Sequence, residues 1–127
     1  MDEVGIQGAA EALLAAIGSG DWDAAAALMD DDFVQEWPQS GERIVGREDA
    51  LAVMRNFPGG PPTTTPRRTL AREDVVVTEV ELRYGDGSVF HGVSILEFRD
   101  GRVVRETDYF AEPFVPPQWR AQWVRRI

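Results

Sequence analysis

Three strand-like runs follow one another in the second half of the chain, and short glycine turns join them. Val75–Tyr84 is rich in β-branched residues, Gly85-Asp86-Gly87 leads into Ser88–Phe98, and Asp100-Gly101 leads into Val103–Phe110. β-Branched residues favour strands. Asp-Gly between two apolar runs is a strong hairpin signal, because both turn residues must tolerate positive φ. The second half of the chain therefore predicts an antiparallel meander.

The last of these runs carries two acids on one face. Side chains alternate along a strand, so Glu106, Asp108 and Phe110 should share a face, with Val103, Arg105, Thr107 and Tyr109 on the other. On a solvated face such acids are ordinary. In an apolar cavity, Asp108 would have a raised pKa and could transfer protons. Glu106 could add to that shift, or could lie in solvent near the hairpin.

The first half of the chain predicts helices. Apolar residues at helical spacing indicate helices over residues 3–17, 22–29 and 47–57. A short strand, Phe33–Pro38, and a return arm, Glu42–Val45, lie between the second and third helices. Helices that are segregated from a meander indicate an α+β fold, and residues 1–127 fit a single domain. A long curved sheet with helices on one side would form a cone with a hollow end.

Two further segments complete the chain. A loop over residues 58–66 precedes a short strand, Arg68–Arg72. Near the other end, Pro117 could begin a final short helix, on which Trp119 and Trp123 would lie on one side. We expect these two rings to make core or dimer contacts.

Composition excludes several classes of function. There is no cysteine, so disulfides, thiolate catalysis and zinc fingers are excluded, and the single histidine, His91, excludes a multi-histidine metal site. The net charge of −9 opposes binding to nucleic acid or anionic lipid. We expect no metal, no nucleic-acid partner and no membrane partner. The acidic start and the lack of a long apolar run predict a cytoplasmic protein.

The two long strands predict one apolar face and one polar face. On Val75–Tyr84, the apolar face consists of Val76, Thr78, Val80, Leu82 and Tyr84, and the polar face consists of Val77, Glu79, Glu81 and Arg83. On the second, Phe90 and Phe98 favour their own side as the inner face. That turns His91 outward, toward a dimer partner or solvent. The inner wall is then mainly apolar, which favours an apolar small ligand.

The first strand leaves two possibilities open. Gln35 and Trp37 share one face, and Val34 and Glu36 share the other. If Trp37 points inward, it would provide a flat platform for a ligand. If Glu36 points inward, it would join Asp108. The sequence does not distinguish these alternatives.

The order of elements resembles the nuclear-transport-factor-two-like (NTF2-like) superfamily, and more closely its SnoaL-like group. The residues that carry the resemblance are Phe33-Val-Gln-Glu-Trp-Pro-Gln-Ser-Gly41, Gly46-Arg47, and Phe98-Arg-Asp-Gly-Arg-Val-Val-Arg-Glu-Thr-Asp-Tyr-Phe110. The resemblance implies a cone with a curved, mostly antiparallel sheet and about three helices on its concave side. It also implies a homodimer through the outer sheet face. Because this fold carries many activities, it defines no reaction.

Limonene epoxide hydrolase, a member of the superfamily, has a similar Asp-Tyr-Phe on its last strand. The resemblance would give its catalytic aspartate role to Asp108. The positions of its other polar partners fall on Val80 and Leu82, and on Val34 and Glu36. Three of these four are apolar here, so epoxide hydrolysis by that mechanism is not expected.

Two other relatives suggest different partners for the acid. Ketosteroid isomerases use an aspartate base near the proline of the first strand, but Trp37 precedes Pro38 here. SnoaL-type polyketide cyclases rely on an Asp–His arrangement. Asp108 and His91 could imitate that arrangement only if both enter the cavity.

The sequence thus predicts a small-molecule enzyme of SnoaL-like type, without a cofactor, that performs isomerisation or cyclisation of an apolar carbonyl compound. The alternative is a non-catalytic small-molecule-binding or dimerisation module, and epoxide hydrolysis with other partners is a third possibility. The candidate catalytic residues are Asp108, Glu106 and Glu36. The candidate substrate-binding residues are Val34, Gln35, Trp37, Val80, Leu82, Phe90, Phe110 and His91.

Overall fold

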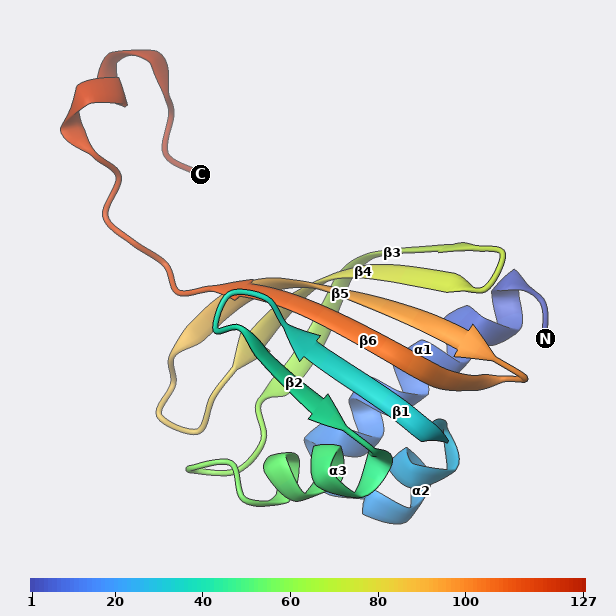
Figure 1. The fold of residues 1–127 in the computed structure, drawn as a ribbon. Coiled ribbons are helices and arrows are strands. Elements are labelled where there is room, and N and C mark those ends of the chain that lie inside the picture. Colours follow the sequence, from blue (N-terminus) through green and yellow to red (C-terminus); the bar gives the residue numbers. More distant parts are fainter.

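The structure, a computed structural model, describes all 127 residues. Three helices, six strands and a short 3₁₀ helix follow the α+β order that the sequence predicts (Figure 1). The elements are α1 (Glu3–Ser19), α2 (Trp22–Ala27), β1 (Met29–Trp37), β2 (Glu42–Val45), α3 (Arg47–Arg55), β3 (Thr63–Arg72), β4 (Val75–Arg83), β5 (Val89–Arg99), β6 (Arg102–Ala111) and η1 (Gln118–Trp123).

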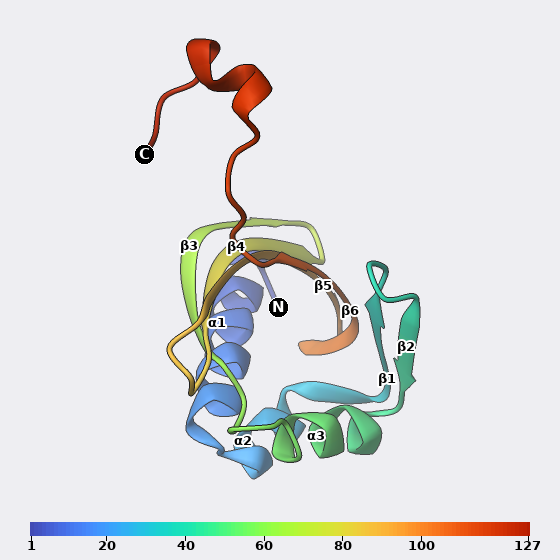
Figure 2. The same cartoon turned by 90° about the vertical axis from the view of Figure 1, so that its left-hand side faces the viewer.

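The six strands form one curved sheet in the order β2-β1-β6-β5-β4-β3. All neighbours are antiparallel except β1 and β6, which are parallel. The sheet curls over α1, and α2 and α3 lie across the lower side of the hollow (Figure 2). This is the cone with three helices on the concave side of a mostly antiparallel sheet. The strand that carries the two acids lies beside the first strand.

Local sequence signals define the ends of α1 and of the last hairpin. The Asp2 side chain accepts a hydrogen bond from the Gly5 amide at 2.8 Å, and Gly20 ends the helix in the left-handed conformation (φ 73°). Asp100 and Gly101 both have positive φ, 51° and 79°, as the Asp-Gly turn requires. Apolar side chains of all three helices then pack on the sheet. The core is Ile6, Ala9, Ala10, Leu13, Ala16, Ala25, Met29, Phe33, Ala50, Leu51, Val76, Leu96, Phe98 and Val103.

Two strands begin earlier than the sequence predicted. β1 begins at Met29 and includes the three aspartates 30–32, ahead of the predicted start at Phe33. Arg99 pairs with Asp30 and Asp32 at 3.0 and 3.2 Å and offsets their charge. β3 begins at Thr63 and includes Pro66. It is the edge strand, where proline costs no ladder bond, and its register shifts between Pro66 and Arg68.

A β-bulge changes which residues of β6 share a face. Phe98 pairs with Val103 and Glu97 pairs with Arg105, so one extra residue lies in β6 between them. Such an insertion reverses the alternation at that point. Val103 is therefore fully buried on the same side as Glu106 and Asp108. The predicted placement of Val103 on the opposite face is wrong.

The segment after β6 leaves the body of the molecule. Residues 112–127, which we name the arm, rise away from the sheet and end in η1 and a short extended stretch (Figures 1 and 2). Trp119 and Trp123 are each 72% exposed, so neither belongs to the core of this chain. A 3₁₀ helix has three residues per turn, so residues four apart do not lie in line as they would in an α-helix. None of the helices has both the length and the apolar character needed to cross a membrane.

Candidate functional site

A cavity of about 330 Å³ lies between the concave face of the sheet and the helices. Its wall is mostly apolar, with contributions from α1, α3, the loop after α3 and the inner faces of β1, β4, β5 and β6. The lining residues are Leu13, Leu14, Ile17, Met29, Phe33, Gln35, Trp37, Ser40, Glu42, Ala50, Leu51, Met54, Phe57, Pro62, Thr64, Val80, Leu82, Tyr84, Gly92, Ser94, Glu106, Asp108, Tyr109 and Phe110. The hollow end that the sequence predicted is therefore large enough for a small organic molecule.

Two carboxyl groups from β6 lie in this wall and share one donor. The Gln35 side-chain amide donates from Nε2 to Glu106 Oε2 at 2.9 Å and to Asp108 Oδ2 at 2.7 Å. Trp37 Nε1 also donates to Asp108 Oδ2, at 3.1 Å. The parallel pairing of β1 with β6 produces this contact, because it places Gln35 directly opposite Glu106. The acids therefore lie on the last strand, β6, and their donors on the first strand, β1.

The two carboxyl groups differ in their hydrogen bonding. Glu106 is 9% exposed and Asp108 is 8% exposed. Burial, then the charge of Asp108, then a hydrogen bond with Asp108 raise the pKa of Glu106 well above its ordinary value. The raised pKa favours a proton on Glu106, whereas Asp108 accepts two hydrogen bonds on Oδ2. Such a pair titrates as a unit.

One polar atom of the pair remains without a partner. Asp108 Oδ1 is buried and has no hydrogen-bond partner in the structure. A buried carboxylate oxygen without a donor is costly. It therefore marks the position where a proton or a ligand donor would be most strongly stabilised.

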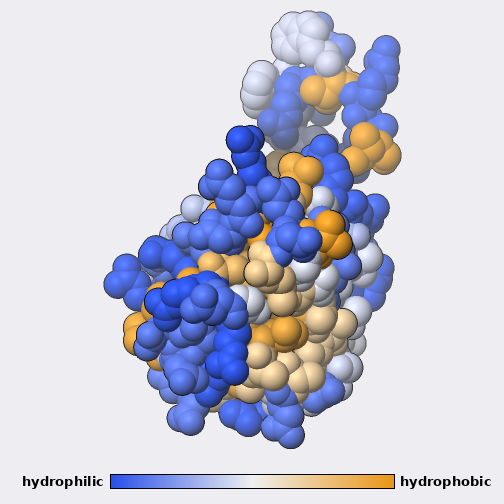
Figure 3. Space-filling view, turned by 90° about the vertical axis from the view of Figure 1, so that its right-hand side faces the viewer, coloured by the Kyte–Doolittle hydropathy of each residue, from blue (hydrophilic) through white to orange (hydrophobic).

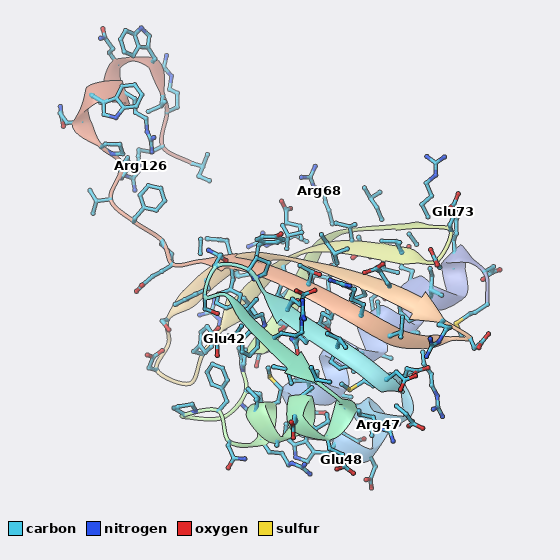
Figure 4. All side chains as sticks on the ribbon, in the orientation of Figure 1. Glu42, Arg47, Glu48, Arg68, Glu73 and Arg126 are labelled. Atoms are coloured by element: carbon cyan, nitrogen blue, oxygen red, sulfur yellow. The ribbon has the colours of Figure 1, made fainter.

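The rest of the cavity offers no positive charge. Arginine and histidine are absent from the wall, and the third acid, Glu42, lies at the exposed start of β2 (Figure 4). Burial raises the pKa of the Tyr84 phenol, which is thus neutral and stacks on Phe57 with ring centroids 5.5 Å apart. Trp37 and Phe110 meet edge to face at 6.5 Å. A ligand would meet aromatic rings and one acidic corner.

Most of the predicted residues do lie at this cavity. Among the candidate catalytic residues, Asp108 and Glu106 line it; the candidate substrate-binding residues that line it are Gln35, Trp37, Val80, Leu82 and Phe110. The possibility that Glu106 lies in solvent is thereby excluded. Phe90 does not line the cavity and instead packs edge to face on Tyr84, a lining residue, with ring centroids 5.0 Å apart.

Besides Phe90, three predicted positions lie outside the cavity. Val34 and Glu36 point to the outer face of β1, and Glu36 forms ion pairs with Arg43 and Arg105 there. His91 is exposed on the outer face of β5. Strand alternation fixes all three once Gln35, Trp37 and Gly92 point inward. Placing Glu36 beside Asp108 is therefore wrong, and an Asp108–His91 pair across the cavity is excluded.

The sequence analysis missed the link between Gln35 and the acids. It left the face of the first strand open and aligned the polar partners of the epoxide hydrolase with Val34 and Glu36, although Gln35 and Trp37 are the residues that point inward. The pairing of the first strand beside the last one, in parallel, carries no local signal in the sequence. Tyr84 and Phe57 were missed as a stacked pair for a similar reason, because Phe57 lies beyond α3.

The curved sheet and the helices on its concave side define an α+β cone of the NTF2-like type, and comparison with known proteins confirms this class. Residues 10–106 match the family model of the SnoaL-like domain, and the chain belongs to this family. The comparison with curated proteins gave no match.

Solved structures give the nearest context for function. The chain is 42% identical to an NTF2-like protein of unknown function from Burkholderia xenovorans LB400, over 98% of this chain and 97% of that one, with a TM-score of 0.84. It is 34% identical to a candidate ketosteroid isomerase from Kribbella flavida DSM 17836, over 99% and 92%, with a TM-score of 0.90. It is 28% identical to an LEH-like (limonene epoxide hydrolase-like) epoxide hydrolase of M. tuberculosis, over 86% and 84%, with a TM-score of 0.76.

Proposed function

We propose that this protein is a cofactor-independent enzyme that isomerises or cyclises an apolar carbonyl compound by acid/base catalysis. The single observation that carries the proposal is the buried pair of Glu106 and Asp108, bridged by Gln35 in an apolar cavity. A protonated acid beside a carboxylate provides both partners that enolisation requires. The candidate ketosteroid isomerase among the similar structures supports the same class of reaction.

The two groups have complementary roles in this reaction. The Asp108 carboxylate removes a proton from the carbon next to the substrate carbonyl, and the electrons of that C–H bond form the carbon–carbon double bond of an enol. Glu106 gives its proton to the carbonyl oxygen as negative charge develops there. In an isomerisation, Asp108 returns its proton to a different carbon and the enol proton returns to Glu106. In a cyclisation, the enol carbon bonds to a second carbonyl carbon, whose oxygen takes the proton from Asp108. The enol hydroxyl returns its proton to Glu106 as the first carbonyl re-forms.

Gln35 and Trp37 would position the base. Both donate to Oδ2 of Asp108, which leaves Oδ1 as the oxygen without a donor. A lone pair that is not engaged in a hydrogen bond is the one available to accept a proton from carbon. Hydrogen-bond donors to a carboxylate favour its charged form, which suits Asp108 to the role of base.

The charge of the wall limits the substrate. A carboxylate or phosphate substrate would enter a site that holds an anion and no cation, and burial of an unpaired charge is costly. Neutral, largely apolar ketones and enones fit the wall, with aromatic contacts from Trp37, Phe57 and Tyr84. About 330 Å³ suits a molecule at the small end of ordinary ligand sites.

The test is deuterium exchange at the carbon next to the carbonyl. A panel of apolar ketones and enones is incubated with the protein in heavy water, and loss of the α-proton signal is followed by NMR. We expect exchange with the wild-type protein and a loss of about 10²–10⁴-fold in Asp108→Asn, the usual contribution of a general base. Glu36→Gln is the matched control, because it removes a carboxylate from a neighbouring strand on the outer face.

Two outcomes would contradict the proposal. If a ketone binds equally well to the wild-type protein and to Asp108→Asn and neither promotes exchange, the cavity belongs to a non-catalytic binding module. If terpene epoxides are converted to diols instead, the acid and base act on an epoxide and water. The LEH-like epoxide hydrolase among the similar structures is the observation that favours this second candidate.

A further inference from the structure

The arm carries apolar side chains that its own chain leaves exposed. Phe114 and Val115 are 74% and 89% exposed, and Trp119 and Trp123 are 72% exposed. The space-filling view shows apolar residues of the arm standing clear of the body (Figure 3). Six apolar residues among the last 14 are exposed: Phe114, Val115, Trp119, Trp123, Val124 and Ile127. Large apolar side chains gathered and exposed on one short segment indicate an interaction site.

The sequence holds the arm away from the sheet. Pro113, Pro116 and Pro117 fix φ and favour an extended, stiff segment. Pro117 is extended (φ −67°, ψ 143°) immediately before η1. The two tryptophans are therefore presented at a distance from the body, with Arg120 over the ring of Trp119 at 5.9 Å. A segment that served only as a loose end would need neither the prolines nor three aromatic residues.

Charge indicates what the arm binds. The arm contains three arginines and one acid, Glu112, a charge of +2, whereas the whole chain has −9, so residues 1–111 carry −11. Figure 4 shows Arg126 on the arm, outside the body of the molecule. A basic, aromatic segment is complementary to the body of another copy of this chain.

A groove for such a contact lies next to the arm. It occupies about 680 Å³ on the outer side of the sheet and is lined by Gln39, Arg67, Glu79, Val80, His91, Gly92, Val93, Tyr109, Phe110, Ala111 and Ile127. One wall is therefore sheet and the other includes Ile127 at the end of the arm. Val93 and Tyr109 bring exposed apolar surface into it.

We propose that the arm packs against a second copy of this chain, in the groove beside that copy's own arm. A two-fold axis makes the contact reciprocal, so that each arm occupies the groove of the other copy. Aromatic side chains bury about 150–250 Å² each. Each arm has three exposed aromatic side chains. At their present exposure, the six of a dimer and the partner surface that they cover would bury roughly 1,300–2,200 Å² in total, which is the range of stable interfaces. This goes beyond a homodimer through the sheet face, because it assigns the contact to residues 112–127.

The test measures dimerisation of the full chain by sedimentation equilibrium. We expect a dimer, with Kd weakened at least about 30-fold by Trp119→Ser/Trp123→Ser, as for two aromatic residues at the centre of an interface. Arg125→Glu/Arg126→Glu should also weaken it. The matched control is Arg55→Glu/Arg72→Glu, which makes the same change in net charge at two exposed arginines outside the arm. Circular dichroism checks that each variant is folded.

A second measurement follows the arm directly. In Trp22→Phe/Trp37→Phe, only the arm retains tryptophan. We expect its fluorescence to resist acrylamide quenching in the dimer and to become accessible on dilution. Accessible arm tryptophans in a dimer would show that another face makes the contact. Protection that does not change on dilution would mean that the arm folds onto its own body, and a monomer at high concentration would exclude a partner copy; each result overturns the proposal.

Discussion

Replacement of Gln35 by leucine should destabilise the protein through the acid pair. Gln35 donates to the Asp108 carboxylate at 2.7 Å and to Glu106 at 2.9 Å, and all three side chains are buried. Hydrogen bonds to charged groups contribute about 1.5–3 kcal/mol and neutral ones about 0.5–1.5 kcal/mol. Gln35→Leu should therefore lower the free energy of unfolding by about 2–4.5 kcal/mol at neutral pH, measured by urea denaturation at one fixed protein concentration.

A double-mutant cycle separates the charged hydrogen bond from packing. With Asp108→Asn in the background, Gln35→Leu removes only neutral hydrogen bonds, so its cost should fall by about 1–1.5 kcal/mol. Gln39→Leu is the control: its side chain is exposed and accepts only the Phe110 amide, so we expect a cost below about 1 kcal/mol. If Gln35→Leu costs no more than Gln39→Leu, or costs the same in both backgrounds, the assignment of Asp108 as an anion held by Gln35 is refuted.

Three further predictions concern the same cavity. Because the folded-state pKa of Glu106 is raised above its ordinary 4.5, the folded protein retains a proton that the unfolded chain loses, so the free energy of unfolding should fall as pH rises from 4.5 to the raised pKa. Denaturation curves at several pH values should show this decrease in the wild-type protein and not in Glu106→Gln. The same pH dependence of stability in both proteins would contradict the prediction. Exchange activity should also decline as pH rises through that raised pKa, because the acid is lost; a profile that rises steadily would remove Glu106 as the acid. Gly92→Ala should lower the free energy of unfolding by about 1–3 kcal/mol, because the added Cβ would lie 2.9 Å from the Tyr109 carbonyl oxygen and 3.4 Å from Leu82. A thermal midpoint equal to that of the wild-type protein would show that the strands adjust to the methyl group.

Local patterns predict the meander and the apolar wall. The alternation in β4 places Val80 and Leu82 in the cavity and Glu79 and Glu81 outside it, as the sequence indicated. The Asp100-Gly101 turn fixes the last hairpin. These features depend on neighbours within one or two strands, and residue type is enough to identify them.

Features set by distant parts of the chain were not predictable in this way. The inward face of β1 depends on its pairing with β6, about 70 residues away in the sequence. From residue types alone, either face of Val34–Trp37 could line the cavity. The bulge in β6 between Val103 and Arg105 leaves no clear mark in residue types, yet it brings Val103 to the buried side. The raised pKa of Glu106 depends on the β1–β6 pairing and on the bulge, because together they bury this acid beside Asp108.

The parallel pairing of β1 and β6 has a consequence for the order in which the protein folds. β3 to β6 pair with their neighbours in the chain, so this part can form early, whereas β1 must wait for a strand that is made near the end of synthesis. Until β1 docks, Glu106 and Asp108 have no amide donor, and the apolar side of the helices has no complete sheet to cover. We therefore expect the last folding step to close the sheet and assemble the acid pair together, so that any population with a formed site is also fully folded.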